Sequence, residues 1–432
     1  MEILGAFMVP HPPLIVEEIG GEEIKKIQDT RDSYIEIARQ IGELKPDTII
    51  ISSPHAPLYS DYFYLPSGLA AKGSFARFGA GDVSFNQKYD TELIEEIENL
   101  SKERNFPCGR LDNEPLDHGT MVPLYFINKY LSDYKLVVVG LSGISLEANY
   151  EMGKIIYEAA SKLNRRIVYI ANGDLSHKLK DDGPYGFVPE GPIYDSRIMD
   201  VMSHAKFDEL LNFDESFLDT AAECGHRSFI IMSGFLNKIK VTPKFYSHED
   251  ITGVGYGICS YYPVDPYVAL ARETINVYIK EHRIIDIPKD ISEELLNTKR
   301  AVFVSIHENG DLRGCIGTLY PVTNCIADEI ISNAIAASTR DPRFPPITEF
   351  ELDDLEINVD VLTEPEQIKD ESELDPKKYG VIVSSGFKKG VLLPDLEGVD
   401  TVEEQIAICK RKGNIHDDEI INLKRFEVIR HK

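Results

Sequence analysis

Three uninterrupted apolar runs, each followed within a few residues by a histidine, constrain this chain most. The runs are Ile3–Val9, Ile49–Ile51 and Ile167–Ala171, and the histidines that follow them are His11, His55 and His177. Runs that are apolar at every position are typical of strands covered on both faces, as in a parallel sheet with helices on each side. The sequence therefore predicts an α/β fold that places an imidazole just beyond the carboxyl end of each of three strands.

Prolines flank two of these histidines, in Pro10-His11-Pro12 and Pro54-His55-Ala56-Pro57. A residue before proline is pushed out of the helical region into extended geometry, so each motif is a stiff turn that ends a strand and fixes the direction of its histidine. In open α/β sheets the ligand crevice lies outside the carboxyl ends of the strands. One histidine alone is more often a buried core residue, but three at one edge predict a metal or acid–base site.

The overall charge of the chain excludes several classes of function. The 432 residues carry a formal net charge of −26, which argues against nucleic acid and against an anionic membrane surface as partners. No run approaches the roughly 20 apolar residues of a membrane helix, and the first run has no basic flank, so we expect neither a membrane span nor a signal peptide. The six cysteines are scattered without a CxxC pair, which predicts no disulfide framework or zinc knuckle and favours a reducing, cytoplasmic location.

Two domains are expected, with the linker at Pro263-Val264-Asp265-Pro266. In residues 1–263, helical patterns such as Glu22–Leu44 alternate with strands, which predicts an α/β sheet layered by helices. Residues 266–432 open with a hairpin around Asn309-Gly310 and continue with a helix and further strands, a smaller α+β pattern.

Three other segments of the first domain have expected roles. Asp117 or Thr120 would cap a helix, which puts His118 at a helix N-terminus. Short strands are expected around Tyr62–Leu65 and Val83–Phe85. The Gly- and Pro-rich stretch Leu179–Pro192 is long enough to form a lid or a substrate wall.

A carboxylate is needed to complete a site of the non-haem iron type. Two histidines and one carboxylate with open positions suit Fe(II) that must bind a substrate and a small molecule together. The candidate is Glu223, because it lies in a short apolar stretch where a charged residue is costly. A place on a helix surface is the alternative for the same residue, and its spacing does not separate the two.

Four motifs of the first domain occur together in the order Pro10-His11-Pro12-Pro13, Ser53-Pro54-His55, Asp117-His118-Gly119 with Pro123-Leu124, and Gly173-Asp174-Leu175-Ser176-His177. On these motifs the domain resembles the class III extradiol dioxygenase superfamily, with its LigB-like fold, and within it most closely the Memo branch. The resemblance implies a layered sheet with helices on both faces. It also implies that His11 and His55 are metal ligands, that His177 is an acid–base residue, and that His118 is a donor on the substrate side.

The third ligand stays open between two neighbouring residues. The dioxygenases have a glutamate there and Memo proteins have a cysteine before glycine, and this chain has both in Glu223-Cys224-Gly225. Chemistry favours Glu223, since it completes a two-histidine, one-carboxylate face, whereas motif matching favours Cys224. A thiolate would make the site softer or redox-active.

The second domain contains the motifs Leu312-Arg313-Gly314-Cys315-Ile316-Gly317, Asp341-Pro342-Arg343-Phe344-Pro345-Pro346 and Gly390-Val391-Leu392-Leu393-Pro394. On these motifs it resembles the AMMECR domain. Cys315 and Arg313 on a glycine-flanked strand suggest a place where a ligand approaches the backbone with a cation nearby. A tight strand crossing with Cys315 simply packed explains them equally well. Arg340 and Arg343 would join Arg313 in an anion-binding cluster if the fold brings them together.

The two domains together resemble the fused form of the AmmeMemoRadiSam set, which implies a radical SAM protein as partner. The leading hypothesis is an extradiol-dioxygenase-like oxidoreductase that holds Fe(II) and acts on an unknown small molecule. A second hypothesis is an accessory, scaffold or redox-sensing component that works with the radical SAM enzyme. Zinc on the same ligands, activating water for hydrolysis, is a third.

Overall fold

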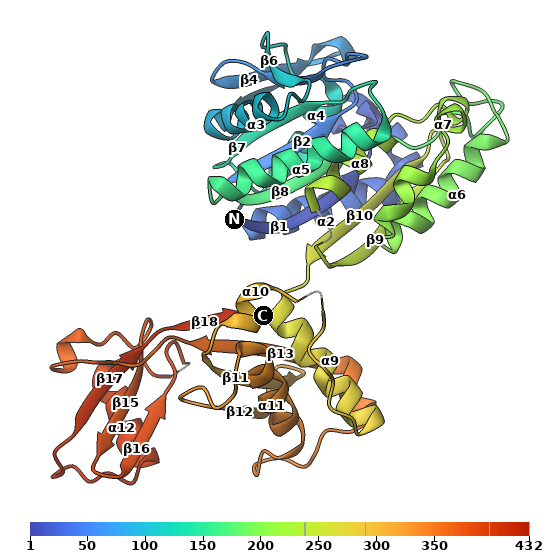
Figure 1. Cartoon of the computed structure of the whole chain (residues 1–432). Helices are drawn as coiled ribbons and strands as arrows, with labels where there is room; N and C mark the ends of the chain where they lie inside the picture. Colours follow the sequence, from blue (N-terminus) through green and yellow to red (C-terminus); the bar gives the residue numbers. More distant parts are fainter. Residues whose placement is uncertain (237–238, 290, 397, 432) are drawn as a thin grey trace. The chain divides into compact units, whose positions relative to one another are not determined.

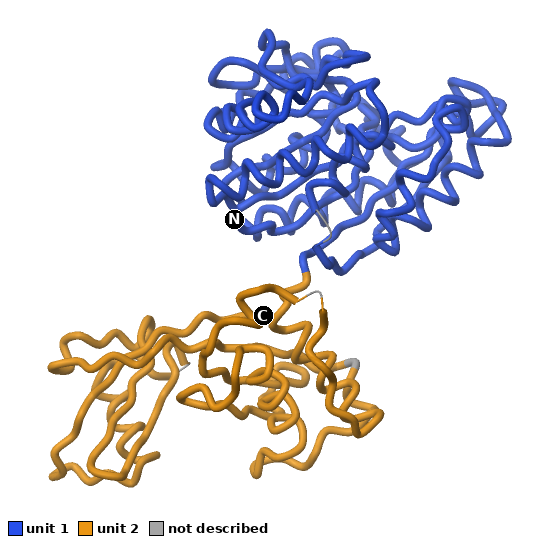
Figure 2. Tube along the Cα trace, viewed as in Figure 1, with its two compact units in different colours: residues 1–263 blue, residues 264–432 orange. Residues whose placement is uncertain are grey.

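The computed structural model of the chain describes residues 1–236, 239–289, 291–396 and 398–431. It divides into two compact units, Met1–Pro263 (unit 1) and Val264–Lys432 (unit 2), which Figure 2 distinguishes by colour. Each unit has its own buried apolar core.

A six-stranded sheet forms the centre of unit 1 (Figure 1). Its strands, in spatial order, are β7 (Lys135–Gly140), β2 (Thr48–Ser53), β8 (Arg166–Asn172), β1 (Glu2–Val9), β10 (Tyr256–Pro263) and β9 (Val241–Glu249). The first four are parallel, and β10 and β9 extend the sheet in antiparallel fashion. The parallel strands are buried at nearly every position, as their continuous apolar runs predict.

Helices cover both faces of this sheet. The longer ones are α2 (Gln28–Leu44), α3 (Thr91–Glu103), α4 (His118–Ile127), α5 (Leu146–Lys162), α6 (Glu190–Ser203) and α8 (His226–Leu236). Helices α3, α5 and α8 pack together on one face, and α2 packs with α4 on the other. This arrangement confirms the predicted layered α/β fold.

Shorter elements surround the sheet. They are α1 (Glu17–Gly20), α7 (Glu215–Ala221), the 3-10 helices η1 (Pro13–Ile15), η2 (Gly21–Ile27), η3 (Ala76–Phe78) and η4 (Phe207–Asn212), and the strands β3 (Phe63–Pro66), β4 (Ala70–Phe75), β5 (Ala80–Lys88) and β6 (Cys108–Leu111). The prediction of a single helix over Glu22–Leu44 is wrong for its first turns, which form η2 instead. The chain changes direction at Ile27, whose φ of −128° and ψ of 45° are not helical.

The register of the parallel strands aligns the segments that carry the histidines. Val9 of β1 pairs with Asn172 of β8, and Ser52 of β2 pairs with Ala171 of β8. The residues that follow β1, β2 and β8 therefore leave the sheet at the same edge.

Unit 2 contains two four-stranded antiparallel sheets. One has the order β12 (Asp311–Gly317), β11 (Ala301–Glu308), β13 (Leu355–Leu362), β18 (Val428–His431), and the other β14 (Glu366–Gln367), β17 (Asn422–Phe426), β15 (Gly380–Ser385), β16 (Lys388–Leu392). The helical elements are α9 (Pro266–Glu281), α10 (Glu293–Asn297), α11 (Ile326–Thr339), α12 (Val402–Lys412), η5 (Glu349–Asp354) and η6 (Glu371–Glu373). The predicted hairpin is confirmed: Asn309 and Gly310, with φ of 52° and 85°, join β11 to β12.

Within the described residues, none of the helices combines the length and the apolar character that a membrane span requires.

Close contact between helices α5 and α8 generates a stability prediction. A Cβ on Gly153 would lie 2.0 Å from the Ile231 carbonyl oxygen, which is backbone and cannot move away. We expect Gly153→Ala to lower the free energy of unfolding of unit 1 by about 1–3 kcal/mol, since overpacking in a dense interior costs that much. Urea denaturation followed by circular dichroism measures the change. Gly81→Ala is the control, because a Cβ there makes only an ordinary 3.5 Å contact with Ala76; equal midpoints for the two variants would contradict the packing argument.

Candidate metal centre

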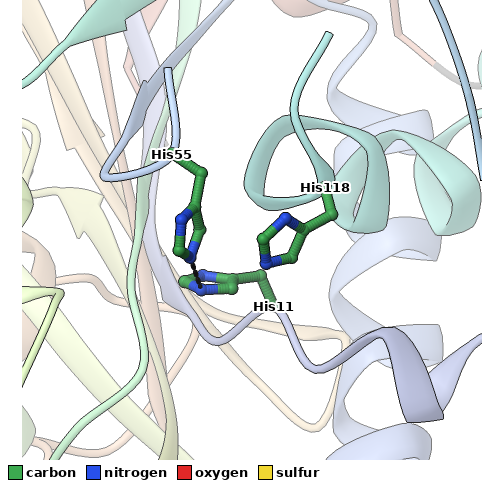
Figure 3. A group of neighbouring side chains, drawn as sticks. All are labelled: His11, His55 and His118. Atoms are coloured by element: carbon green, nitrogen blue, oxygen red, sulfur yellow. Dashed lines mark hydrogen bonds between the residues drawn. The ribbon is translucent and has the colours of Figure 1, made fainter. Parts of the chain in front are cut away.

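Three histidine side chains converge at the carboxyl edge of the unit 1 sheet (Figure 3). His11 follows β1, His55 follows β2, and His118 is the first residue of α4. The Nε2 atoms of His11 and His55 are 2.9 Å apart, and the His118 ring centroid lies 4.1 Å from that of His55. One potential ligand atom from each of the three lies within 4.8 Å of the others.

A buried amide fixes the proton position on His11. The Nδ1 atom of His11 is 2.6 Å from the side-chain oxygen of Asn172. The amide nitrogen of the same Asn172 side chain donates to the Pro10 carbonyl at 3.5 Å. Since an amide oxygen only accepts, Nδ1 carries the proton and Nε2 presents its lone pair to the site. Asn172 is the last residue of β8, so the strand pairing itself delivers this partner.

The start of helix α4 is docked onto the end of β2. The Asp117 carboxylate accepts from the Thr120 backbone N–H at 3.0 Å and from the Ser53 hydroxyl at 2.6 Å. A Cβ on Gly119 would lie 2.5 Å from the Ser53 Oγ, so only glycine permits this approach. Of the two residues predicted to cap α4, Asp117 is the N-cap.

A second group of potential ligands shares His11. Together with His11 it contains Asp174 and Cys224, and their ligand atoms also lie within 4.8 Å of one another. The Cys224 Sγ is 3.8 Å from the His11 Nε2, and an Asp174 carboxylate oxygen is 3.6 Å from it. The other oxygen of Asp174 accepts from the His11 backbone N–H at 2.8 Å. Sequence reasoning missed Asp174, although it stands in the Gly173–His177 motif, three residues before His177.

Backbone hydrogen bonds hold the Cys224 segment against the Asp174 segment. The Asp174 N–H donates to the Cys224 Sγ at 3.3 Å, and the Cys224 N–H donates to the Asp174 carbonyl at the same distance. A Cβ on Gly173 would lie 2.0 Å from the Cα of Gly225, so the two segments touch through their glycines.

His177 lies beside this second group. Its Nδ1 donates to the Ala222 carbonyl, which leaves Nε2 without the proton, 3.9 Å from an Asp174 carboxylate oxygen. The side chain is 22% exposed, so a ligand can reach it.

Glu223 is not in either group of potential ligands found among the described residues. Its side chain is partly buried, and its carboxylate accepts from the N–H of His226, the first residue of α8, at 2.6 Å. Burial raises the pKa of Glu223 to about 7, opposed by that hydrogen bond. The structure therefore gives Glu223 a capping position at the helix start and brings its neighbour Cys224 to the histidines.

The protonation states of the histidines suit metal binding. Burial, and then the neighbouring His55, lower the pKa of both His11 and His118 to about 3. Burial also lowers the pKa of His55. All three are therefore neutral near pH 7, which is the form that binds metals. Burial raises the pKa of the Cys224 thiol, a shift that a bound cation would reverse.

The distance between the Nε2 atoms of His11 and His55 is suitable for two ligands of the same metal ion. Two nitrogens that each lie about 2.1 Å from one ion, at a right angle to each other, are about 3 Å apart. The His11–His55 separation of 2.9 Å matches this value. Imidazole nitrogen, carboxylate oxygen and thiolate sulfur are all donors for iron or zinc.

The candidate residues of unit 2 take part in local pairing. The Cys315 N–H donates to Asp341 at 2.9 Å, and its sulfur accepts from the Ser305 hydroxyl at 3.2 Å. Arg343 pairs with the same Asp341 at 2.7 Å and donates to the Cys315 carbonyl. Arg313 pairs with Glu351 at 2.7 Å and donates to the Pro345 carbonyl. Arg313 and Arg343 thus fasten the Asp341–Pro346 segment to β12, a structural use of both cations.

Comparison with known families identifies both units. Residues 5–259 match the model of the catalytic LigB subunit of aromatic ring-opening dioxygenases, and residues 268–431 match the AMMECR1 model. A Clostridium acetobutylicum protein is 41% identical over 467 aligned residues that cover both chains completely. A Thermotoga maritima protein is 50% identical over 39% of this chain and 97% of its own length. A crystal structure of an uncharacterised Pyrococcus horikoshii protein is 32% identical, covers 38% of this chain and 88% of its own, and has a TM-score of 0.35.

The Asn172 hydrogen bond generates a prediction about metal affinity. We expect Asn172→Leu to weaken binding of Fe(II) or Co(II) about 10- to 100-fold, because the His11 imidazole loses the partner that sets its tautomer and orientation. Asn172→Asp keeps an acceptor and should bind nearly as tightly as the natural chain. Anaerobic equilibrium dialysis measures the affinities, with Asn86→Leu on the exposed face of β5 as the control. Equal affinities for Asn172→Leu and Asn172→Asp would rule out this role.

Proposed function

This chain belongs to the family of the catalytic LigB subunit of aromatic ring-opening dioxygenases, and on that premise we propose that unit 1 is an iron-dependent oxygenase-type enzyme. The observation that carries the proposal is the 2.9 Å approach of the His11 and His55 Nε2 atoms, beside a thiol and a carboxylate. Fe(II), when bound, would supply a redox-active centre at which an oxygen-chelating substrate and dioxygen meet.

His11, His55 and Cys224 would hold the iron. We assign Cys224 rather than Asp174 as the third ligand, because Asp174 already accepts from the His11 backbone and also faces His177. Glu223 is not proposed, since its carboxylate caps α8. His118 lies against the His55 ring and would donate to or accept from the substrate.

His177 would move the proton of the substrate. Because its Nδ1 donates to the Ala222 carbonyl, its Nε2 is the atom that accepts a proton from a substrate hydroxyl. Asp174, with a carboxylate oxygen 3.9 Å from that Nε2, would stabilise the imidazolium that results.

A second candidate function is an accessory or redox-sensing component of an AmmeMemoRadiSam set, with a radical SAM protein as partner. The observation that favours it is Cys224, since a sulfur beside the buried His11 provides an oxidisable group at the site. Zinc on the same residues, activating a water molecule, would give a hydrolase instead. Oxygen consumption with simple catechols separates the first function from both: uptake supports the oxygenase, and its absence in iron-loaded protein contradicts it.

Metal content tests the assignment of the ligands. We expect near-stoichiometric iron in anaerobically purified protein, measured by mass spectrometry. His11→Ala, His55→Ala and Cys224→Ala should lose most of it, because each removes a donor atom. Glu223→Gln should keep it, since the side chain retains an oxygen that can accept from His226. Iron lost with Glu223→Gln but kept with Cys224→Ala would refute the assignment of Cys224 as a ligand. Asp174→Asn tests whether the Asp174 carboxylate is a ligand instead.

Substitution of His177 tests the proton-transfer role. We expect His177→Gln to retain iron and to lower the rate of oxygen uptake about 10²- to 10⁴-fold, the usual contribution of a positioned acid–base group. His204→Gln, at an exposed histidine after α6, is the matched control. An unchanged rate in His177→Gln would remove His177 from the mechanism.

A further inference from the structure

Two exposed aromatic side chains lie next to histidines of the site. The Phe78 ring centroid is 5.4 Å from that of His118, and the Tyr185 ring centroid is 5.2 Å from that of His177. Phe78 is 38% exposed and Tyr185 is 62% exposed. Single exposed aromatic residues are common on proteins, but these two each contact a different histidine of one site.

The β4–β5 hairpin holds Phe78 in place. Phe78 ends η3, inside this hairpin, and packs on Phe75, which is fully buried and 6.2 Å away between ring centroids. The hairpin is fastened to the segment before His118, since the Leu116 N–H donates to the Lys72 carbonyl at 2.7 Å. Gly79, with φ of 85°, then turns the chain away. The exposed face of Phe78 is therefore fixed relative to His118.

The loop between β8 and α6 holds Tyr185 in a similar way. The Leu179 N–H donates to the Gly253 carbonyl at 3.1 Å, and the Val188 N–H donates to the Lys178 carbonyl at 3.2 Å. These bonds close the base of the loop on itself and on the β9–β10 turn. Gly186, with φ of 77°, follows Tyr185 directly. Leu179–Pro192, the segment expected to form a lid or a substrate wall, is thus fixed at its base by hydrogen bonds, which favours the wall.

A row of contacts links the two aromatic residues across the site. The His118 ring centroid is 5.3 Å from that of His11, and Asp174 lies 3.6 Å from the His11 Nε2 and 3.9 Å from the His177 Nε2. Phe78 stands at the His118 end of this row and Tyr185 at the His177 end. Phe78 contacts His118 and Tyr185 contacts His177, so each aromatic ring is connected through one histidine to the groups around the His11 Nε2.

We propose that Phe78 and Tyr185 are specificity-determining residues that select a flat, apolar ring system on the ligand. This inference rests on the proposed function, because the ligand is taken to be held at the metal centre. Aromatic rings gain from offset or edge-to-face contacts and from the apolar area that they bury together. A chelating ligand without a ring lacks both gains, so the two side chains discriminate by ring and not by chelating group.

Two chelating probes separate the ring from the metal. Naphthalene-2,3-diol and acetohydroxamate both chelate through two oxygens, and only the first carries an aromatic system. Binding of each to the full chain loaded with Fe(II) is measured by anaerobic calorimetry. We expect Phe78→Ala and Tyr185→Ala each to weaken the diol about tenfold and to leave acetohydroxamate within about twofold. Tyr185→Phe should bind the diol like the natural chain, because it keeps the ring. Phe387→Ala, at a fully exposed aromatic residue of unit 2, is the control.

The outcomes distinguish this inference from the proposed function. Equal losses for both probes, or no loss for either, would overturn the role of the aromatic residues while the metal centre stands. Absence of acetohydroxamate binding to the natural chain would instead contradict the metal centre. In that case the diol, titrated into metal-free protein, still decides the inference: binding that weakens in both alanine variants supports it, and absence of binding overturns it.

Discussion

The candidate site depends on the parallel pairing of β1, β2 and β8 in one register. This pairing brings Asn172 beside His11 and puts the residues after β2 at the same edge, because Val9 is paired with Asn172 and Ser52 with Ala171. A shift by one residue would reverse the face of every side chain on the shifted strand. Such a shift would break the close packing of particular side chains on both buried faces, so the positions of the histidines follow from how the core packs.

His118 is placed at the same edge of the sheet by contacts between the ends of two secondary structure elements. Helix α4 starts where Asp117 meets the Ser53 hydroxyl, so His118 is placed by a cap and a strand end together. Gly119 and Gly173 allow backbone to approach backbone at this point. The ends of secondary structure elements thus carry the ligands, and the loops between them are fixed by short hydrogen bonds.

Sequence reasoning was sufficient for the features that follow from local pattern. The buried strands, the Asn309-Gly310 hairpin and the placement of His11 and His55 at one edge follow from periodicity and turn chemistry. Capping predicted His118 at a helix N-terminus, but its approach to His11 and His55 is visible only in the structure. The choice between Glu223 and Cys224 does not follow from local pattern, because it depends on a single turn. Ala222, with φ of 52°, ends α7 in the left-handed conformation, after which Glu223 caps α8 and Cys224 meets Asp174. The role of Asp174 likewise depends on a contact across 163 residues, with the His11 N–H.

Asp174 connects the metal-binding side of the site to its proton-transfer side. One oxygen accepts from the His11 backbone, and the other lies between the His11 and His177 imidazoles. Burial raises the pKa of this carboxyl group, whereas a cation held near His11 would lower it again, so the bound ion would favour the carboxylate form. The ionised carboxylate would in turn stabilise the imidazolium that forms when His177 accepts a proton from the substrate. The bound ion and the acid–base residue would therefore act through one shared side chain, which is a reason for an aspartate at this position.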